Sequence, residues 1–449
     1  MNIADVKRMF GGGAGTGRQV GMIAILAAIV VLFQALTGGM TLNPANLISL
    51  VSQYSYILIL AIGMVMVIIA GHIDLSVGSV AAFVGIVVAN LMQDTSLPWP
   101  FAVLAGLGVG ALIGAWHGFW VAYVGVPAFI VTLAGLLFFR GANQFVGNAE
   151  TIPVPQEFRV IGSGFLPEVG PDTGYNNLTL LLGAIGIIAL AIGEVRLRRR
   201  QQERGAQQAP RWVSALKVLI GAILLAWASM LFASGRVGTS FPVSGIILLG
   251  LAIVYTFLMK NTVFGRSVYA VGGNAQAARL SGVKTKRVNF LVMMNMSVLA
   301  ALAGMIYVAR AAASGPQDGL NWEFDAISAV FIGGAAVAGG VGTVSGSIVG
   351  GLVMAVLNNG LQLLGVGTDR VQMIKGLVIL AAVAVDIYNR RQGRASLIGR
   401  WLDGPRTTGT GGGTGGPTRA NTPAGSIAGA DPTNGRARSG AAATPGHSN

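Results

Sequence analysis

The sequence contains no cysteine, and only 10% of its 449 residues are charged. An ordinary soluble domain has roughly 25% charged residues, so this chain is poorly suited to fold in water. The lack of cysteine excludes disulfide bonds, thiolate metal sites and a cysteine nucleophile. The three histidines are scattered, at His72, His117 and His447, and we expect no metal site.

The signatures of nucleotide binding and of common hydrolytic chemistry are also missing. There is no G-x-x-x-x-G-K-[ST] motif, no G-x-S-x-G elbow and no H-E-x-x-H helix. We therefore expect no catalytic residue and no cofactor bound by this chain. If ATP drives the protein, another subunit must bind ATP and Mg²⁺.

Long apolar runs are abundant, with 53% hydrophobic side chains and 67 glycines. Crossing about 30 Å of hydrocarbon takes roughly 17 to 25 apolar residues, and glycine is common in such helices. The sequence predicts an all-α polytopic membrane protein of about 10–12 transmembrane helices, some of them broken or re-entrant. The spans fall near residues 20–36, 48–70, 75–92, 100–124, 127–146, 178–194, 213–233, 243–259, 288–309, 326–344, 346–365 and 371–388.

The distribution of charge predicts the topology. If residues 1–19 lie in the cytoplasm, every basic loop also lies there, as the positive-inside rule requires. The basic segments are 196–211, 260–287 and 390–394, whereas the acidic residues Glu150, Glu157, Glu168, Asp172, Asp318, Glu323 and Asp325 fall outside. We expect a multi-pass protein of the cell membrane, in contact with membrane lipid, with both termini cytoplasmic. The net charge of +14 sets topology, and we expect no nucleic-acid partner.

Three regions follow from composition. Residues 1–19 form a cytoplasmic segment, residues 20–390 a membrane domain, and residues 391–449 a Gly-, Thr- and Pro-rich cytoplasmic tail predicted to be disordered. Within the membrane domain, residues 71–76 and 333–347 are rich in glycine and polar side chains. Either segment could be a break in a helix.

The loop at 260–287 carries six positive charges and no negative ones. Asn274 is a good helix N-cap and Gly282 a good residue to follow a helix end. The seven residues between them predict a two-turn docking helix with a small-residue face formed by Ala275, Ala277 and Ala278.

Several polar residues interrupt the apolar spans. Asp74 either caps the third helix at the cytoplasmic surface or acts with Ser76 at a gate or pathway, where a His72/Asp74 proton relay is one form. Lys375 either snorkels to the interface or pairs with an acidic residue on another helix. The amides of Gln53, Asn295, Asn358 and Asn359 suit a neutral, hydroxyl-rich solute, and interhelical hydrogen bonding is an equal alternative.

Small residues recur at every fourth position in two places. One set is Gly106, Gly110, Gly114 and Gly118, and the other is Gly334, Ala338, Gly342, Gly346 and Gly350. Such spacing lets two helix backbones approach closely. We expect internal packing faces, with a face that slides during gating as the alternative.

Five segments together resemble the ribose and xylose-type branch of ABC permeases. They are GHIDLSVGS (71–79), VPAFIVTLAG (126–135), FGRSVYAVGGNAQAARLSGV (264–283), FIGGAAVAGGVGTVSGSIVGG (331–351) and IKGLVILAAVAVD (374–386). The resemblance covers about residues 20–390. Two departures are His72, where the family usually has glycine, and Gln276, which replaces the glutamate of the wider importer motif.

The resemblance implies a permease subunit that pairs with itself or a close relative, two ABC ATPase subunits and an extracytoplasmic sugar-binding protein. It implies that ATPase coupling involves Gly273, Asn274, Gln276, Ala277, Ala278, Arg279, Ser281 and Gly282. Loops 147–177 and 311–325 are then candidate docking surfaces for the binding protein. Xylose or another pentose is the first expectation for the cargo, and a proton-coupled sugar carrier acting alone is the alternative.

Overall fold

The computed structural model describes residues 16–203, 205, 210–235 and 238–391, and these residues are almost entirely helical. The expectation of a disordered tail concerns residues that, from 392 onward, lie outside the described part of the chain. The helices of the first half are α2 (Thr16–Leu36), α3 (Pro44–Ile69), α4 (Val77–Asp94), α5 (Trp99–Phe119) with a π-helical end η1 (Trp120–Val124), α6 (Ala128–Val146), α7 (Val160–Ser163), α8 (Asn177–Glu203) and α9 (Arg211–Ala233).

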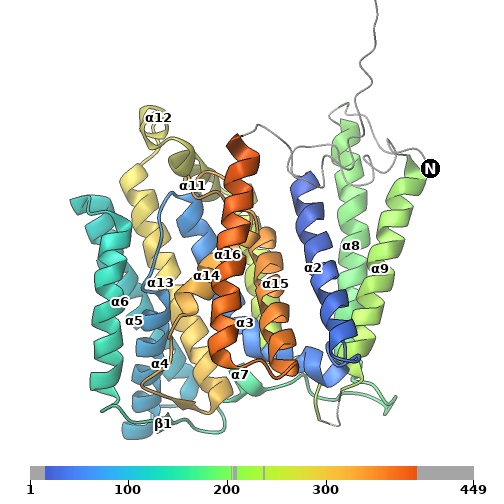
Figure 1. Ribbon diagram of the computed structural model, residues 1–449, viewed down its shortest axis with the longest axis horizontal. Coiled ribbons are helices and arrows are strands. Elements are labelled where there is room, and N and C mark those ends of the chain that lie inside the picture. The colour runs from blue at the N-terminus through green and yellow to red at the C-terminus, as the bar shows by residue number, and fades with distance from the viewer. Residues whose placement is uncertain (1–15, 204, 206–209, 236–237, 392–449) are drawn as a thin grey trace, which may run out of the picture. The chain divides into compact units, whose positions relative to one another are not determined.

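The second half contains α10 to α16, shown from yellow-green to red in Figure 1. Their bounds are α10 (Val243–Asn261), α11 (Val263–Gly273), α12 (Ala275–Leu280), α13 (Thr285–Ala311), α14 (Trp322–Ile332), α15 (Val344–Leu363) and α16 (Thr368–Arg391). Two short strands, β1 (Ile152–Pro153) and β2 (Ala313–Ser314), pair antiparallel. Within the described residues, nine helices are long and apolar enough to cross a membrane, which confirms a polytopic helical fold.

The main departure from the predicted spans lies at residues 326–344. Here α14 is only 11 residues long and ends at Ile332, after which residues 333–343 form turns before α15 begins. A helix of this length extends about 16 Å, roughly half the hydrocarbon thickness. The span placed at 326–344 is therefore interrupted, within the segment 333–347 that the sequence marked as a possible break.

Local signals explain where the long helices begin. Asn43 accepts a hydrogen bond from the Ala45 amide through Oδ1 at 3.0 Å, and Pro44 occupies the first turn of α3. Thr343 does the same for α15, accepting from the Gly346 amide at 3.0 Å. Each cap satisfies a backbone donor that the helix itself leaves free.

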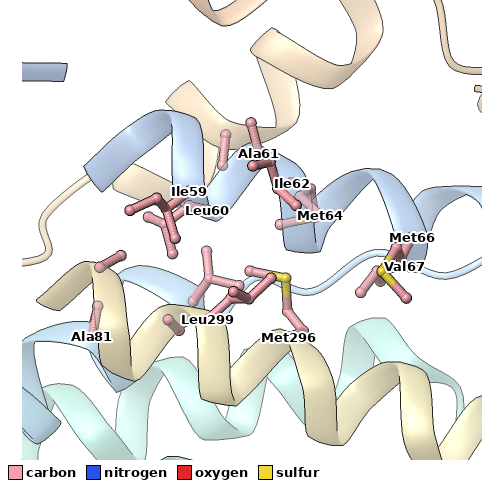
Figure 2. Packing of buried hydrophobic residues seen from close by; sticks show 14 of the residues in the cluster. Ile59, Leu60, Ala61, Ile62, Met64, Met66, Val67, Ala81, Met296 and Leu299 are labelled. Atoms are coloured by element: carbon pink, nitrogen blue, oxygen red, sulfur yellow. The ribbon is translucent and has the colours of Figure 1, made fainter. Parts of the chain in front are cut away.

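The core is centred on α3, where residues 57–70 are all buried. Figure 2 shows Ile59, Leu60 and Met64 of α3 against Met296 and Leu299 of α13. The two helices come close at Gly63, where an added Cβ atom would lie 2.6 Å from the Met296 sulfur. A larger residue at Gly63 would therefore require the Met296 side chain to move.

The glycine stripe of α5 packs against α13, as expected for an internal packing face. A Cβ added at Gly110 would lie 2.6 Å from the Ala301 Cβ, and one added at Gly114 would lie 2.5 Å from the Met294 Cα. The second stripe does not form one helix face, because residues 333–343 are not helical. Its helical part still packs closely, since a Cβ at Gly350 would overlap the backbone oxygen of Ala329.

Helices α8 and α9 form a hairpin that stands apart from this core. They contact each other, and their most apolar windows are 6% and 0% buried, respectively. Figure 1 shows the pair in green, and α9 contacts α3 of the core. At the helix crossing, a Cβ added at Gly221 of α9 would lie 2.8 Å from Leu190 of α8.

Candidate functional site

The docking helix predicted in the basic loop is α12, which Figure 1 shows above the start of α13. Asn274 accepts from the Ala277 amide through Oδ1 at 2.9 Å, so it is the N-cap. Gly282 adopts φ = +86°, and the Gly282 and Val283 amides donate to the Arg279 and Ala278 carbonyls at 3.1 and 3.0 Å. Both helix ends therefore lie where the sequence predicted them. Asn is a favoured N-cap residue, and the left-handed residue after a helix end is usually glycine.

The exposed face of α12 differs from the expected one. Ala278 is buried, at 6% exposure, whereas Gln276, Ala277 and Arg279 are exposed, and Leu280 is 81% exposed. The three alanines therefore do not share one outward face. The outward face of α12 consists of Ala275, Gln276, Ala277, Arg279 and Leu280, while Ala278 packs against its own chain.

The segment before α12 rests on two glycine-rich segments. Residues 71–76, called the first break below, connect the complete spans α3 and α4, and residues 333–343, called the second break, follow the half-helix α14. The Gly340 amide donates to the Ile69 carbonyl at 2.8 Å, and a Cβ at Gly272 would overlap that same carbonyl oxygen. At Gly339, which adopts φ = +81°, a Cβ would lie 2.9 Å from the Gly272 carbonyl oxygen and 3.0 Å from the Gly71 Cα. We call the residues Gly71, Gly272, Gly273, Gly339 and Gly340 the glycine junction.

A tyrosine fastens α11 to the second break. The Tyr269 hydroxyl donates to the Gly342 carbonyl at 2.8 Å. Burial raises the pKa of Tyr269, so its proton is retained and the hydroxyl remains a donor. Three segments far apart in sequence are thus joined backbone to backbone next to α12, an arrangement that side chains larger than hydrogen would prevent.

Asp74 organises the first break. Its Oδ1 accepts from the Ser76 amide at 2.8 Å and from the Ser76 hydroxyl at 2.7 Å. The Leu75 amide donates to the Thr132 hydroxyl at 3.1 Å, which attaches the break to α6. Asp74 is only 1% exposed, and the residue at the N-cap of α4 is Ser76, so Asp74 is not a cap at the surface.

The imidazole near Asp74 is not the one that the sequence indicated. His117 of α5 is 1% exposed and lies against Gly135, where an added Cβ would be 2.5 Å from Nε2 and 3.3 Å from the Ser76 Cβ. The sequence around His117 is that of an ordinary apolar helix and did not predict that this side chain would lie next to residues 71–76. The structure has no hydrogen bond between His72 and Asp74 among its described contacts, so the proposed relay is not formed in this conformation.

Lys375 of α16 pairs with Asp325 of α14, so of the two alternatives the ion pair is the correct one. The side chains are 17% and 16% exposed, respectively. The pair joins the half-helix α14 to the last helix. Because Asp325 is paired, it is not available on the expected docking surface at 311–325. Glu323 is not available there either, because it is only 2% exposed.

The candidate amides mostly hold helices together. Asn359 and Asn46 exchange two hydrogen bonds of 2.9 Å between α15 and α3. Asn295 of α13 accepts from the Tyr255 hydroxyl of α10, and Gln53 donates to Ser49 within α3 at 3.0 Å. Asn358 is buried at 6% exposure.

The six candidate pathway residues do not form a single cluster. Asp74 and Ser76 lie at the first break, close to the glycine junction. Asn358 and Asn359 lie in the last two turns of α15, about 20 Å along that helix from the second break. The residues predicted to couple to an ATPase, by contrast, form one continuous segment, residues 273–282.

The described residues form a multi-pass membrane protein with one helix interrupted at residues 333–343 and an exposed capped helix, features that transport proteins often have. The comparisons agree. Residues 46–383 match the family described as "Branched-chain amino acid transport system / permease component". The chain belongs to this family of ABC permeases, which are transport subunits and not enzymes.

Individual relatives cover most of the chain. The xylose transport system permease protein XylH of Haemophilus influenzae is 39% identical, over 83% of this chain and 96% of its own length. The Escherichia coli XylH is 38% identical, over 83% and 92%. The ribose import permease protein RbsC of Escherichia coli is 32% identical, over 83% and 94%. No solved structure matches the chain.

Proposed function

We propose that this chain is the membrane subunit of an ABC importer that carries a monosaccharide, with xylose or another pentose as the first expectation. A separate ATPase hydrolyses ATP, and an extracytoplasmic binding protein delivers the sugar. The observation that carries the proposal is the contact of α11, which leads directly into α12, with residues 71–76 and 333–343 at the glycine junction.

The mechanism follows from this contact. Closure of the ATPase dimer displaces α12 through its exposed residues Gln276, Arg279 and Leu280. Because α11 touches the carbonyl of Ile69 and the backbone at Gly339, the displacement reaches the ends of α3 and α15 directly. A helix can reorient where it is interrupted. In this proposal the junction therefore converts the movement of α12 into opening of the sugar pathway on one side of the membrane and closing on the other.

The sugar assignment rests on the relatives, which are xylose and ribose permeases by name. In this proposal specificity resides mainly in the binding protein. Its docking surface is loop 147–177, where Glu150, Glu157, Glu168 and Asp172 are exposed. Loop 311–325 is a weaker candidate, because Glu323 is buried and Asp318 accepts from the Gly315 amide of its own loop.

The assembly would contain two permease subunits, two ATPases and one binding protein, with the α12 side of the membrane domain cytoplasmic. The test is uptake of labelled xylose into proteoliposomes. Uptake should require the ATPase, ATP and the binding protein together. If this chain alone took up sugar in response to a proton gradient, the secondary-carrier alternative would replace the proposal.

Arg279→Glu gives a second test. Reversing this exposed charge should abolish co-purification with the ATPase without unfolding the membrane domain. Ala278 is less suitable than its sequence position suggests, because a bulky residue at this buried site would displace α12 from its own chain. Unchanged co-purification of the Arg279 variant would contradict the docking assignment.

A further inference from the structure

A cleft of 480 Å³ lies beside the docking helix, between the start of α11 and the first turns of α13. Its volume is within the roughly 300–1,000 Å³ typical of small-molecule sites. Lys284, Arg287, Val288 and Leu291 follow one another along the start of α13, and Phe264 of α11 also lines the cleft. Nothing in the transport mechanism above uses this cleft.

The lining of the cleft changes from charged to apolar along the first turns of α13. Lys284 and Arg287 precede the apolar run of α13 and are exposed, whereas Val288 and Leu291 belong to that run. Within the described residues, neither cation has an acidic partner, and loop 260–287 contains no acid at all. The cleft therefore offers positive charge at the membrane surface and apolar contact just below it.

The backbone adds to the positive potential. Lys284 is the N-cap residue of α13, a 27-residue helix, and no side chain caps this end. The positive end of the helix dipole is thus left beside two cations. A polar solute such as free phosphate would use the charge but not the apolar wall.

We propose that this cleft binds an anionic phospholipid, with its phosphate at Lys284 and Arg287 and its glycerol and acyl chains against Phe264, Val288 and Leu291. Basic pockets at the ends of membrane helices bind such head groups. A bound lipid would contact both α11 and α13, the two helices that flank α12, and would so stabilise the position of α12. The proposal holds for any cargo and does not depend on the sugar.

The test is native mass spectrometry of the full-length chain in detergent, titrated with phosphatidylglycerol or with phosphatidylcholine of the same chain length. The wild type should bind phosphatidylglycerol more tightly. K284Q/R287Q should bind it about 10- to 30-fold more weakly, because both cations at the membrane surface are lost. The matched control is K286Q, which removes an exposed charge from the same turn but not from the cleft, and should bind nearly as the wild type does.

Leu291→Gln tests the apolar wall and should weaken phosphatidylglycerol binding without changing competition by inorganic phosphate. Thermal unfolding establishes that each variant is folded. Equal binding of the two lipids, or unchanged binding by K284Q/R287Q, would overturn the proposal. The proposal would also be overturned if K284Q/R287Q bound phosphatidylglycerol as the wild type does but no longer bound the ATPase. The two cations would then contact acidic side chains of that subunit.

Discussion

The α8–α9 hairpin and the α3–α4–α13–α15 core are built from similarly apolar helices and differ in burial. The most apolar windows of α8 and α9 have mean hydropathies of 2.3 and 2.1, yet they are 6% and 0% buried. Those of α4 and α15 have a mean hydropathy of only 1.5 and are 67% and 72% buried. In a membrane, hydropathy therefore indicates which segments cross but not which ones form the core.

The difference arises because lipid is as apolar as leucine, so exposure of large side chains costs little there. The core helices are held by close approach instead, as where Gly304 of α13 meets the backbone of Ala81 in α4, and α5 packs on α13 in the same way through Gly110 and Gly114. The glycine-rich and polar residues at 71–76 and 333–343 interrupt the apolar pattern, and they lie where the core meets the end of α11. The following substitutions test this contrast.

The largest effect is expected for Gly272→Val at the glycine junction. A side chain at this position collides with the Ile69 carbonyl, which is backbone and cannot rotate away. ATP-driven uptake in proteoliposomes should be lost. The control from the hairpin is Gly193→Val in α8, where an added Cβ meets nothing within 4 Å, and it should retain uptake. Comparable loss in both variants would contradict the role of the junction.

Breaking the ion pair comes next. Lys375→Met leaves Asp325 without its partner in a mostly buried site and should destabilise the protein by about 3 kcal/mol, as removal of one partner of a buried pair does. The double variant D325N/K375M should recover most of this loss in thermal unfolding. Lys217→Met in α9, which has no acidic partner among the described residues, should change little. A double variant no better than the single one would show that the pair is not the cause.

The glycine stripe predicts a smaller effect on stability. Gly114→Ala places a Cβ 2.5 Å from the Met294 Cα and should destabilise the protein by about 1 to 3 kcal/mol. Gly108→Ala on the same helix has open space and should be neutral or slightly stabilising. Equal unfolding temperatures for the two variants would mean that α5 does not depend on this packing.

The smallest effect is expected in the hairpin. Leu224→Ala in α9 removes a side chain that is 58% exposed and should shift stability by less than about 0.5 kcal/mol. Leu58→Ala in α3, where the leucine is 2% exposed, should cost about 2 to 5 kcal/mol. Similar losses in unfolding experiments would mean that the hairpin is packed against something and is not a peripheral element.

The sequence predicted the features that depend on local chemistry. The caps Asn274 and Gly282 define α12 because their backbone roles are nearly independent of the rest of the fold. The break at 333–343 was visible from its glycines, although the half-helix before it was read as part of one possible span. Lys375 was correctly recognised as unusual, but its partner required knowing that α14 and α16 are neighbours.

The features that depend on tertiary approach were not predictable. Nothing local distinguishes Ala278, which faces inward, from Ala277, which faces outward. His117 resembles a lone histidine in an apolar helix until α5, α6 and the first break come together. The meeting of Gly272 with Ile69 and Gly340 joins segments some 70 to 270 residues apart, and single-sequence patterns carry no such information.

The central claim is that α12 is the point at which an ATPase contacts this chain. Because the chain contains no cysteine, a single Leu280→Cys substitution provides one unique thiol at a position of α12 that is 81% exposed. With a short bifunctional thiol-reactive cross-linker, this variant should form a covalent adduct with the ATPase, whereas Glu168→Cys in the opposite loop should not. Adducts of equal yield from both positions, or none from Leu280→Cys in an assembled complex, would contradict the account.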